Sequence, residues 1–268
     1  MQVYLEEAMI QGLLRLIGAY KIYEKWLSRV IGRGEIPSHI AIIMDGNRRW
    51  ALKRGLEPWL GHRAGAKKVE EVVRWCLELG VKVVTFFVLS TENFRRDEKE
   101  IKELFNILRE KLEEHLKGDL LHKNRIRVKV LGRKDLLPGE LTEALEKLEE
   151  LTKEYDNLFV NLAIAYGGRA EITDAARSLA RDVLAGKVKV EEINEELISR
   201  YLYTADLPIQ DPDMIIRTSG EERISNFLLW QSAYSELIFL DVYWPEFRKI
   251  DLMRAIRTYQ RRQRRFGG

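Results

Sequence analysis

The chain has 268 residues, of which 46% are hydrophobic and 32% are charged, and its formal net charge at pH 7 is +3. This composition is ample for a globular core, and a net charge so close to zero gives by itself no reason to expect nucleic-acid binding. The single cysteine, Cys76, excludes a disulfide framework and a cysteine-based zinc site, and its apolar helical surroundings are typical of a buried, inert thiol.

Residues 1–36 carry an amphipathic helical pattern that differs from the rest of the chain. Apolar side chains recur at helical spacing from Leu13 to Val30, and a Gly-Arg-Gly sequence then ends the pattern. We therefore expect a helical extension over residues 1–36 and one domain over residues 37–268. Packing of the extension on that domain or on a partner subunit is the preferred interpretation, and contact with a membrane surface is the alternative.

No segment has the form of a targeting or membrane-spanning signal. The sequence shows neither a signal peptide with a cleavage site nor an apolar run long enough to cross a bilayer. We therefore expect a cytoplasmic protein, with peripheral contact at a membrane surface left open.

From His39 onward, short apolar runs alternate with helical patterns, an order typical of βαβ units. We expect an α/β domain with a central, mainly parallel six-stranded sheet flanked by helices. The predicted strands are residues 40–44, 81–89, 127–131, 158–165, 214–217 and 237–241. The predicted helices are residues 64–79, 97–116, 139–155, 169–184, 190–203, 224–234 and 249–266.

The first predicted strand ends abruptly in Asp45-Gly46-Asn47-Arg48-Arg49. In open α/β sheets, ligands bind just beyond the carboxyl ends of strands. Gly46 permits close approach of a ligand to the backbone, and the paired arginines offer forked donors for phosphate oxygens. A carboxylate beside a phosphate needs a divalent cation between them, so Asp45 is a predicted Mg²⁺ ligand.

Polar segments also follow three further predicted strands, at residues 90–96, 166–169 and 217–226. Ordinary turns with solvated charges would explain any one of them. Four such segments at equivalent strand ends instead indicate one site for more than one phosphate group, since arginine forks, hydroxyls and helix-start amides all favour phosphate oxygens.

These segments together resemble the cis-prenyltransferase family, the polyprenyl diphosphate synthases of the undecaprenyl and dehydrodolichyl type. The resemblance covers nearly everything from residue 39 onward, through HIAIIMDGNRRWA, GHRAGA, STENF, AYGGR, IIRTSGEERISNFLLWQSAYSELIF and RRFGG. The Asn-Arg-Arg form of the first loop is closer to archaeal and eukaryotic members than to typical bacterial ones.

The resemblance implies a homodimeric, Mg²⁺-dependent enzyme. It would condense isopentenyl diphosphate successively onto an allylic primer, farnesyl or geranylgeranyl diphosphate. The product would be a long-chain polycis-polyprenyl diphosphate, the precursor of a glycosyl carrier lipid. A non-catalytic accessory subunit of a prenyltransferase is the alternative, although the presence of Asp45 and Asn93 argues against it.

The resemblance also assigns residues to the allylic diphosphate. Asp45 would hold Mg²⁺ against it, and His62 would donate a hydrogen bond or relay a proton, with helix capping as its plain structural alternative. Trp50 and Phe94 would bound the pocket, a role that core packing explains equally well. The residues that would cradle the phosphate oxygens are Gly46, Asn47, Arg48 and Arg49.

Other residues are assigned to isopentenyl diphosphate and to proton removal. Its phosphates would be held by Arg217, Arg223 and Ser225, and Ile224 is a further substrate-binding residue. Asn93 would lie in the proton-acceptor region with Ser90, Thr91 and Glu92. An amide is a poor base, so diphosphate or water remain open as the acceptor. Glu236 would complete the metal site, from the same or a neighbouring subunit, and Arg96 would bind phosphate or cap the next helix.

A long product requires a hydrophobic tunnel. Apolar residues at helical spacing are candidates for its lining, although core packing is the commonest cause of such a stripe. These residues are Ile101, Leu104, Phe105, Leu108 and Leu112, joined by Val88, Leu89 and Leu158. Residues 246–268 form a basic tail, which phosphate binding or a solvated helix face explains better than nucleic-acid binding, so no nucleic-acid partner is expected. The resemblance implies that Arg265-Phe266-Gly267 lies near the diphosphate site across a dimer interface.

Overall fold

The computed structural model describes residues 18–95 and 97–262. These residues form two compact units, one from residues 18–36 and 248–262 and the other from residues 37–247. The first unit contains residues 18–36, the described part of the predicted extension. The predicted domain over residues 37–268 is divided between the two units. Residues 1–17, Arg96 and the predicted diphosphate-binding tail residues Arg265 to Gly267 lie outside the described residues.

The larger unit is built on a six-stranded sheet with the order β3-β4-β2-β1-β5-β6. All neighbouring strands are parallel, which confirms the predicted fold class. The central strands β1 and β5 are buried along their whole length, as continuous apolar runs in a parallel sheet should be. The strands are β1 (His39–Ile43), β2 (Val83–Ser90), β3 (Ile126–Leu131), β4 (Leu158–Tyr166), β5 (Met214–Thr218) and β6 (Glu236–Leu240).

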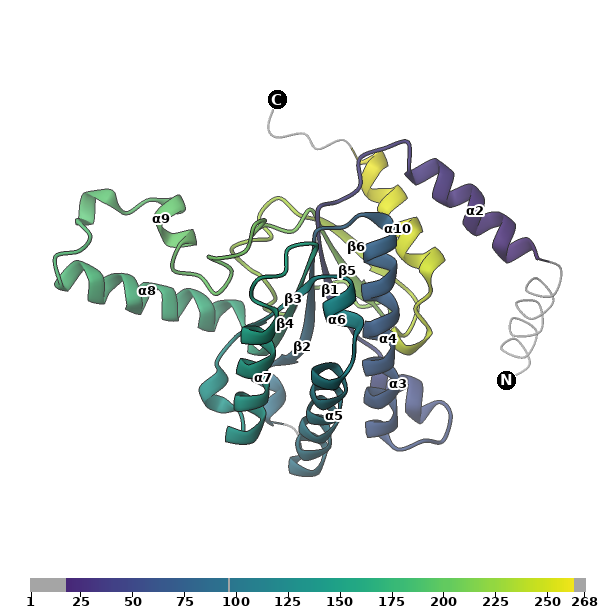
Figure 1. Ribbon diagram of the computed structural model, residues 1–268, viewed down its shortest axis with the longest axis horizontal. Helices are drawn as coiled ribbons and strands as arrows, with labels where there is room; N and C mark the ends of the chain where they lie inside the picture. The colour runs from purple at the N-terminus through teal and green to yellow at the C-terminus, as the bar shows by residue number, and fades with distance from the viewer. Residues whose placement is uncertain (1–17, 96, 263–268) are drawn as a thin grey trace. The chain divides into compact units, whose positions relative to one another are not determined.

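One face of the sheet is covered by helices that follow β1, β2 and β3 in the chain (Figure 1). Pro58 supplies the fixed φ angle of the first helical turn of α4, and the left-handed Gly80 ends that helix. The side chain of Asp97 accepts a hydrogen bond from Lys99 N at 2.8 Å and so caps α5. The helices are α4 (Pro58–Leu79), α5 (Glu98–Lys117), α6 (Leu120–Lys123) and α7 (Gly139–Thr152).

The opposite face is covered partly by the segment before β6, where the predicted helix over residues 224–234 is wrong. Ser225, Asn226 and Leu228 have φ angles of 48°, 64° and 45°, whereas an α-helix requires a φ near −63°. The segment instead forms turns that bury Phe227 and Leu228 in a core cluster with Tyr166.

The predicted helix over residues 190–203 is also largely absent. Its only α-helical part is α9 (Glu195–Ser199), preceded by a 3₁₀ turn over Val190–Glu192. The side chain of Asn194 accepts a hydrogen bond from Leu197 N at 2.8 Å, so it starts a new helix instead of continuing an earlier one. Figure 1 shows α8 (Gly168–Leu184) and α9 extending away from the sheet.

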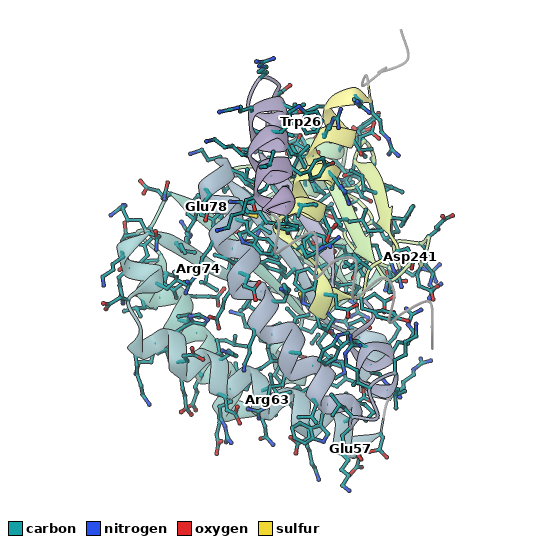
Figure 2. The ribbon with its side chains drawn as sticks, turned by 90° about the vertical axis from the view of Figure 1, so that its right-hand side faces the viewer. Trp26, Glu57, Arg63, Arg74, Glu78 and Asp241 are labelled. Carbon is teal, nitrogen blue, oxygen red and sulfur yellow. The ribbon has the colours of Figure 1, made fainter. Side chains whose placement is uncertain are left out.

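The smaller unit pairs α2 (Ala19–Ile31) with α10 (Lys249–Arg261). Arg254 lies 5.2 Å from the ring centre of Tyr23 and Arg257 lies 4.9 Å from that of Trp26, which is labelled in Figure 2. Such cation–π contacts stabilise the packing of α2 against α10. Among the described residues, no helix combines the length and apolarity that crossing a bilayer requires.

Candidate active site

The loop after β1 is fixed by contacts with distant parts of the same unit. The backbone oxygen of Asp45 accepts hydrogen bonds from Thr218 Oγ1 at 2.7 Å and from Trp244 N at 3.0 Å. Gly46 has a φ of 100°, and a Cβ atom there would lie 2.6 Å from the ring of Tyr243. Only glycine therefore allows the chain to turn from β1 directly into the short helix α3 (Asn47–Leu52).

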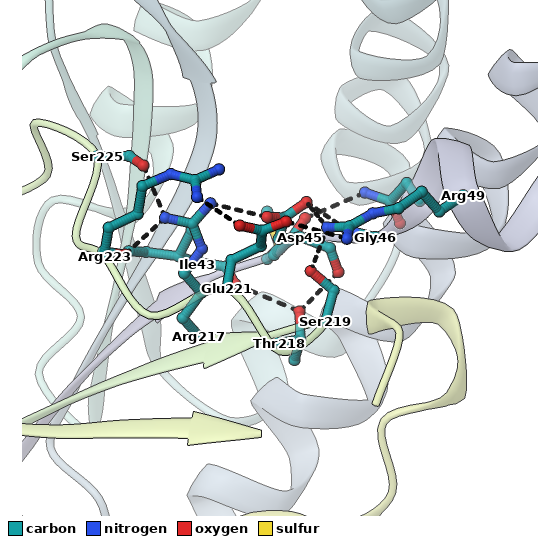
Figure 3. Close-up of polar contacts among 12 residues, drawn as sticks. Ile43, Asp45, Gly46, Arg49, Arg217, Thr218, Ser219, Glu221, Arg223 and Ser225 are labelled. Carbon is teal, nitrogen blue, oxygen red and sulfur yellow. Dashed lines mark hydrogen bonds and ion pairs between the residues drawn. The ribbon is translucent and has the colours of Figure 1, made fainter. Parts of the chain in front are cut away.

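The carboxylate of Asp45 lies among positively charged donors (Figure 3). Its Oδ2 accepts from Arg217 Nη2 at 2.8 Å, and its Oδ1 accepts from Gly46 N at 2.6 Å and Arg49 Nη2 at 3.3 Å. Burial opposes ionisation of this group, but the hydrogen bond and charge of Arg217, with the charge of Arg49, hold the pKa of Asp45 below its ordinary value. Asp45 is therefore an anion at neutral pH.

Arg217 joins the strand ends of β1 and β5 and is almost completely buried, with 5% of its side chain exposed. Its Nη1 donates to Ser225 Oγ at 2.6 Å and to the backbone oxygen of Arg223 at 2.5 Å. The buried Nε of Arg217 has no hydrogen-bond partner among the described residues. Because an unpaired donor on a buried charge is costly, this guanidinium is suited to receive an anion.

Arg49 and Arg223 converge on one carboxylate, that of Glu221 (Figure 3). Arg49 Nη1 donates to Glu221 Oε1 at 3.1 Å, and Arg49 Nη2 donates to Ser219 Oγ at 2.6 Å. Arg223 Nη1 pairs with the other oxygen of Glu221. Arg49, Arg217 and Arg223 thus outnumber the two carboxylates that they pair with, Asp45 and Glu221, so the mouth of the site carries a net positive charge suited to phosphate.

Two glycines of α4 allow α3 to pack closely against it. A Cβ atom at Gly61 would lie 2.1 Å from the backbone oxygen of Asn47, and one at Gly65 would lie 2.4 Å from Asn47 Oδ1. This approach brings His62 beside the loop, where its Nε2 lies 3.4 Å from Glu100 Oε1. Arg48 Nη1 lies 3.5 Å from the other oxygen of Glu100, so the start of α5 is joined to the site.

Two adjoining cavities meet at Met44, Asn47 and His62, which line both. The first, of about 340 Å³, is formed by the charged loop from Met44 to Arg49 with Leu52 and His62. The second, of about 160 Å³, lies between the sheet, α4, α5 and α7, and its wall is mainly apolar. Of the predicted tunnel stripe, Val88, Leu89, Leu104, Leu108 and Leu112 line this second cavity, whereas Ile101, Phe105 and Leu158 do not.

The segment after β2 is held by its own side chains and by Asn226. Ser90 N donates to Asn93 Oδ1 at 3.0 Å, and Asn93 N donates to Ser90 Oγ at 3.2 Å. Asn226 Nδ2 donates to Glu92 Oε1 at 2.9 Å. A Cβ atom at Gly167 would lie 2.8 Å from Thr91 Oγ1, so the segment also approaches the start of α8 closely. These contacts fix its position relative to the strand end of β4.

Three predicted site residues, Trp50, Phe94 and Ile224, line neither of the two cavities. Ile224 packs on the core cluster of the sheet, and the ring of Phe94 packs 6.2 Å from that of Phe105. Trp50 lies under the guanidinium of Arg54, which is 4.5 Å from its ring centre.

Glu236 is also placed away from Asp45 within one chain. It is the first residue of β6 and pairs with Met214, which pairs with Ile40 at the start of β1. Asp45 follows the other end of β1, five residues further on, a separation of about 16 Å along the strands. Glu236 and Asp45 of the same subunit therefore do not form one metal site. Within residues 18–95 and 97–262, no group of three or more His, Cys, Asp or Glu side chains could hold a metal ion.

Several residues that organise the site were not predicted individually from the sequence. Ser219 and Glu221 follow β5 and belong to the same polar segment, residues 217–226, as Arg217. Asn226 was expected on a helix, whereas its left-handed turn lets it bond to Glu92 and to the amide of Arg169. Tyr243 follows β6 in a segment without any pattern that distinguishes a site.

Comparison with known proteins gives consistent matches over nearly the whole chain. The prenyltransferase family model for undecaprenyl diphosphate synthases matches residues 43–267. A tritrans,polycis-undecaprenyl-diphosphate synthase (geranylgeranyl-diphosphate specific) of Methanopyrus kandleri is 54% identical over 248 residues, or 92% of this chain and 91% of the relative. The protein of the same name from Pyrococcus furiosus is 54% identical over 249 residues, or 93% of this chain and 94% of the relative.

A solved structure with a similar fold is lavandulyl diphosphate synthase from Lavandula x intermedia, in complex with dimethylallyl diphosphate. Its TM-score to this chain is 0.84 at 35% sequence identity, and the match covers 87% of this chain and 99% of that structure.

Proposed function

This chain belongs to the undecaprenyl diphosphate synthase family of cis-prenyltransferases, and from that premise we propose that it elongates an allylic diphosphate primer with isopentenyl diphosphate to a long-chain polycis-polyprenyl diphosphate. The names of the two archaeal relatives support geranylgeranyl diphosphate as the primer. The product would serve as the precursor of a glycosyl carrier lipid.

One observation supports this proposal most directly: a charged cavity adjoins an apolar one, and Met44, Asn47 and His62 line both. An allylic diphosphate has the same two parts, a highly charged head and an apolar tail. The head would lie among the donors of the Asp45 loop, and the tail would enter between α4 and α5. Holding the reactive carbon at this junction supplies the orientation that condensation requires.

Arg217, Arg223 and Ser225 are proposed to hold the phosphates of isopentenyl diphosphate. Arg217 already donates to Ser225 and to Asp45, so it lies between the two proposed diphosphate positions. Placing the two substrates on either side of this residue brings the double bond of one toward the allylic carbon of the other. The arginines would also stabilise negative charge on the departing diphosphate as the allylic C–O bond breaks.

Asp45 is proposed to hold Mg²⁺ together with phosphate oxygens and water. Its ionised carboxylate, exposed over 27% of its side-chain surface, is the type of oxygen ligand that Mg²⁺ binds. When bound, the ion would neutralise charge on the leaving diphosphate. The two carboxylate oxygens of Asp45 already accept hydrogen bonds from Arg217 and Arg49. Binding of Mg²⁺ to the same oxygens would therefore require Asp45 to release one of these arginines in part.

Asn93 is proposed to position substrate and not to act as a base. Its Oδ1 accepts from Ser90 N, and a neutral amide has little basicity. Diphosphate or water would therefore accept the proton. Glu236 lies at the far end of the strands, so it would contribute to a metal site only from a neighbouring subunit of a homodimer. We also propose that the protein makes peripheral contact with a membrane surface.

Elongation by the purified chain tests the function. Labelled isopentenyl diphosphate is incubated with Mg²⁺ and with farnesyl or geranylgeranyl diphosphate, and butanol-extractable product is measured. We expect long-chain product, made more efficiently from geranylgeranyl diphosphate, and its loss in the near-isosteric Asp45→Asn variant. Absence of product with both primers would refute the proposal, and activity restored by a second protein would support the accessory-subunit alternative.

A further inference from the structure

The smaller unit, which contains α2 and α10, carries more positive charge than the protein as a whole. Residues 18–36 and 248–262 contain ten lysines and arginines and three aspartates and glutamates, a net charge of +7. The whole chain has a net charge of only +3, so all other residues together are net negative. Charge that is gathered on one part of a protein attracts anionic partners to that part.

One side of α2 is exposed and combines apolar with basic residues. Leu27 is completely buried and marks the side of the helix that packs inward. Ile22, Lys25, Trp26 and Arg29 recur at i, i+3, i+4 and i+7, so they form one stripe on the other side of the helix, the α2 stripe. Ile22 is 70% exposed and Trp26 is 44% exposed, and Lys25 and Arg29 are exposed as well.

The three carboxylates of residues 18–36 and 248–262 lie outside the α2 stripe. Glu24 Oε1 lies 3.3 Å from Lys249 Nζ, and Asp251 Oδ2 accepts from Arg248 Nε at 2.9 Å. The third, Glu35, follows the end of α2. The cations of the stripe therefore face outward with no carboxylate in the same stripe, and an anion from outside can approach them.

Two arginines of α10 continue this basic surface. The guanidinium of Arg257 lies 4.9 Å from the ring centre of Trp26, and that of Arg254 lies 5.2 Å from the ring centre of Tyr23. Trp26, labelled in Figure 2, thus offers a large apolar ring beside cationic groups. Tryptophan is favoured where a membrane meets water, and lysine and arginine can bury their apolar stems there while their charges reach phosphate.

The combination of apolar and basic residues indicates the kind of partner. A nucleic-acid backbone would engage the cations but would leave Ile22 and the ring of Trp26 without an apolar partner. A second copy of the same unit would bring two net charges of +7 together, which is unfavourable. The surface of an anionic bilayer offers phosphate groups and acyl chains at one place, as basic helices that lie in the interface require.

We propose that the α2 stripe and the two arginines of α10 bind the anionic headgroups of a lipid bilayer, with Ile22 and Trp26 at the level of the acyl chains. Membrane contact is part of the proposed function, and the α2 stripe supplies a surface for it and requires the lipid to be anionic. The use of this contact rests on the proposed function, because a long-chain polyprenyl product is too apolar to leave into water and would pass to a bilayer held beside the enzyme.

Co-sedimentation of the full-length protein with phosphatidylcholine vesicles, with and without phosphatidylglycerol, tests the charge requirement. We expect binding only when phosphatidylglycerol is present, and weaker binding as added salt screens the cations. K21Q/K25Q/R29Q removes three exposed cations of α2 and should lower the partition coefficient roughly 100-fold, since each basic residue near an anionic surface contributes a factor of about five. R177Q/R181Q/K187Q is the matched control, because it removes the same charge from exposed positions on and just after α8, and it should bind within about threefold of the wild type.

The apolar part of the α2 stripe is tested separately. I22S/W26S should lower the partition coefficient about tenfold, and the loss should persist at high salt because burial of apolar surface does not depend on screening. L184S/V190S is the matched control, because Leu184 is 89% exposed and Val190 is 63% exposed in the larger unit. This control should leave vesicle binding unchanged.

Equal binding to uncharged vesicles, unchanged binding of folded K21Q/K25Q/R29Q, or an equal fall in the α8 control would each overturn the inference. Absence of vesicle binding, together with self-association that K21Q/K25Q/R29Q abolishes, would assign the stripe to a second copy and would also overturn it. Should the triple variant fail to fold by circular dichroism, R29Q decides in its place, with a fall of about fivefold expected and no change contradicting the inference. Elongation by isopentenyl diphosphate is measured without vesicles. Its absence would refute the proposed function, while vesicle binding would still report on the α2 stripe.

Discussion

The replacement of Arg217 by lysine tests whether one forked side chain links the two proposed diphosphate positions. Arg217→Lys keeps the positive charge but removes the fork. In the structure, the guanidinium donates to Asp45 at 2.8 Å and to Ser225 at 2.6 Å from different nitrogens. A lysine ammonium is a compact charge at the end of a flexible chain and cannot reproduce both contacts in that geometry.

The expected magnitude follows from the contact that is lost. A hydrogen bond to a charged group contributes about 1.5–3 kcal/mol. Since about 1.4 kcal/mol corresponds to a factor of ten, kcat/KM for isopentenyl diphosphate should fall by roughly 10- to 150-fold. The side chain is only 5% exposed, so water cannot easily replace the missing partner.

Initial rates over a range of isopentenyl diphosphate concentrations, at saturating primer, measure this effect. Arg109→Lys is the matched control, because Arg109 is 48% exposed, forms a surface ion pair with Glu140 and belongs to no proposed substrate site. Such pairs contribute about 0–1 kcal/mol, so this variant should lose no more than about fivefold. The reasoning fails if Arg217→Lys stays within about threefold of the wild type, or if the exposed arginine proves the more sensitive of the two.

Three further predictions concern packing, pH and metal. Gly61→Ala would place a Cβ atom 2.1 Å from the backbone oxygen of Asn47. We expect this variant to lose about 1–3 kcal/mol of its free energy of unfolding in a denaturant titration. Gly139→Ala is the control and should be neutral, because no atom lies within 4 Å of the added Cβ. Burial lowers the pKa of His39 to about 4. The folded state thus binds fewer protons, so stability is complete above pH 6.5 and falls by about 3 kcal/mol toward pH 4. Denaturant titrations across this range should show that loss, and a His39→Gln variant with an undiminished loss would contradict the assignment. For Asp45→Asn, Mg²⁺ should no longer strengthen the binding of geranylgeranyl diphosphate in titration calorimetry, and an unchanged Mg²⁺ dependence of binding would remove Asp45 from the metal site.

The strands could be predicted because each is specified by local sequence. Short apolar runs such as Ile40 to Ile43 are suited to a strand buried on both faces, wherever that strand lies in the sheet. The helix predicted over residues 224–234 was wrong because its apolar spacing suits a turn equally well. Ser225, Asn226 and Leu228 adopt left-handed backbone angles, and the burial of Phe227 and Leu228 in the core accompanies this arrangement.

The sequence by itself determined the α/β class, the Asp45-Gly46 turn and the polar character of the strand ends, since all three depend on neighbouring residues. Only the tertiary structure decided which of these groups meet. Asp45 pairs with Arg217, 172 residues away, because β1 lies beside β5 in the sheet. The parallel register of β6 places Glu236 at the opposite strand ends, and the packing of α4 and α5 on the sheet leaves charged residues of both helices beside the apolar cavity. Strand order and helix packing depend on contacts across the whole unit, and no local pattern of residues specifies them.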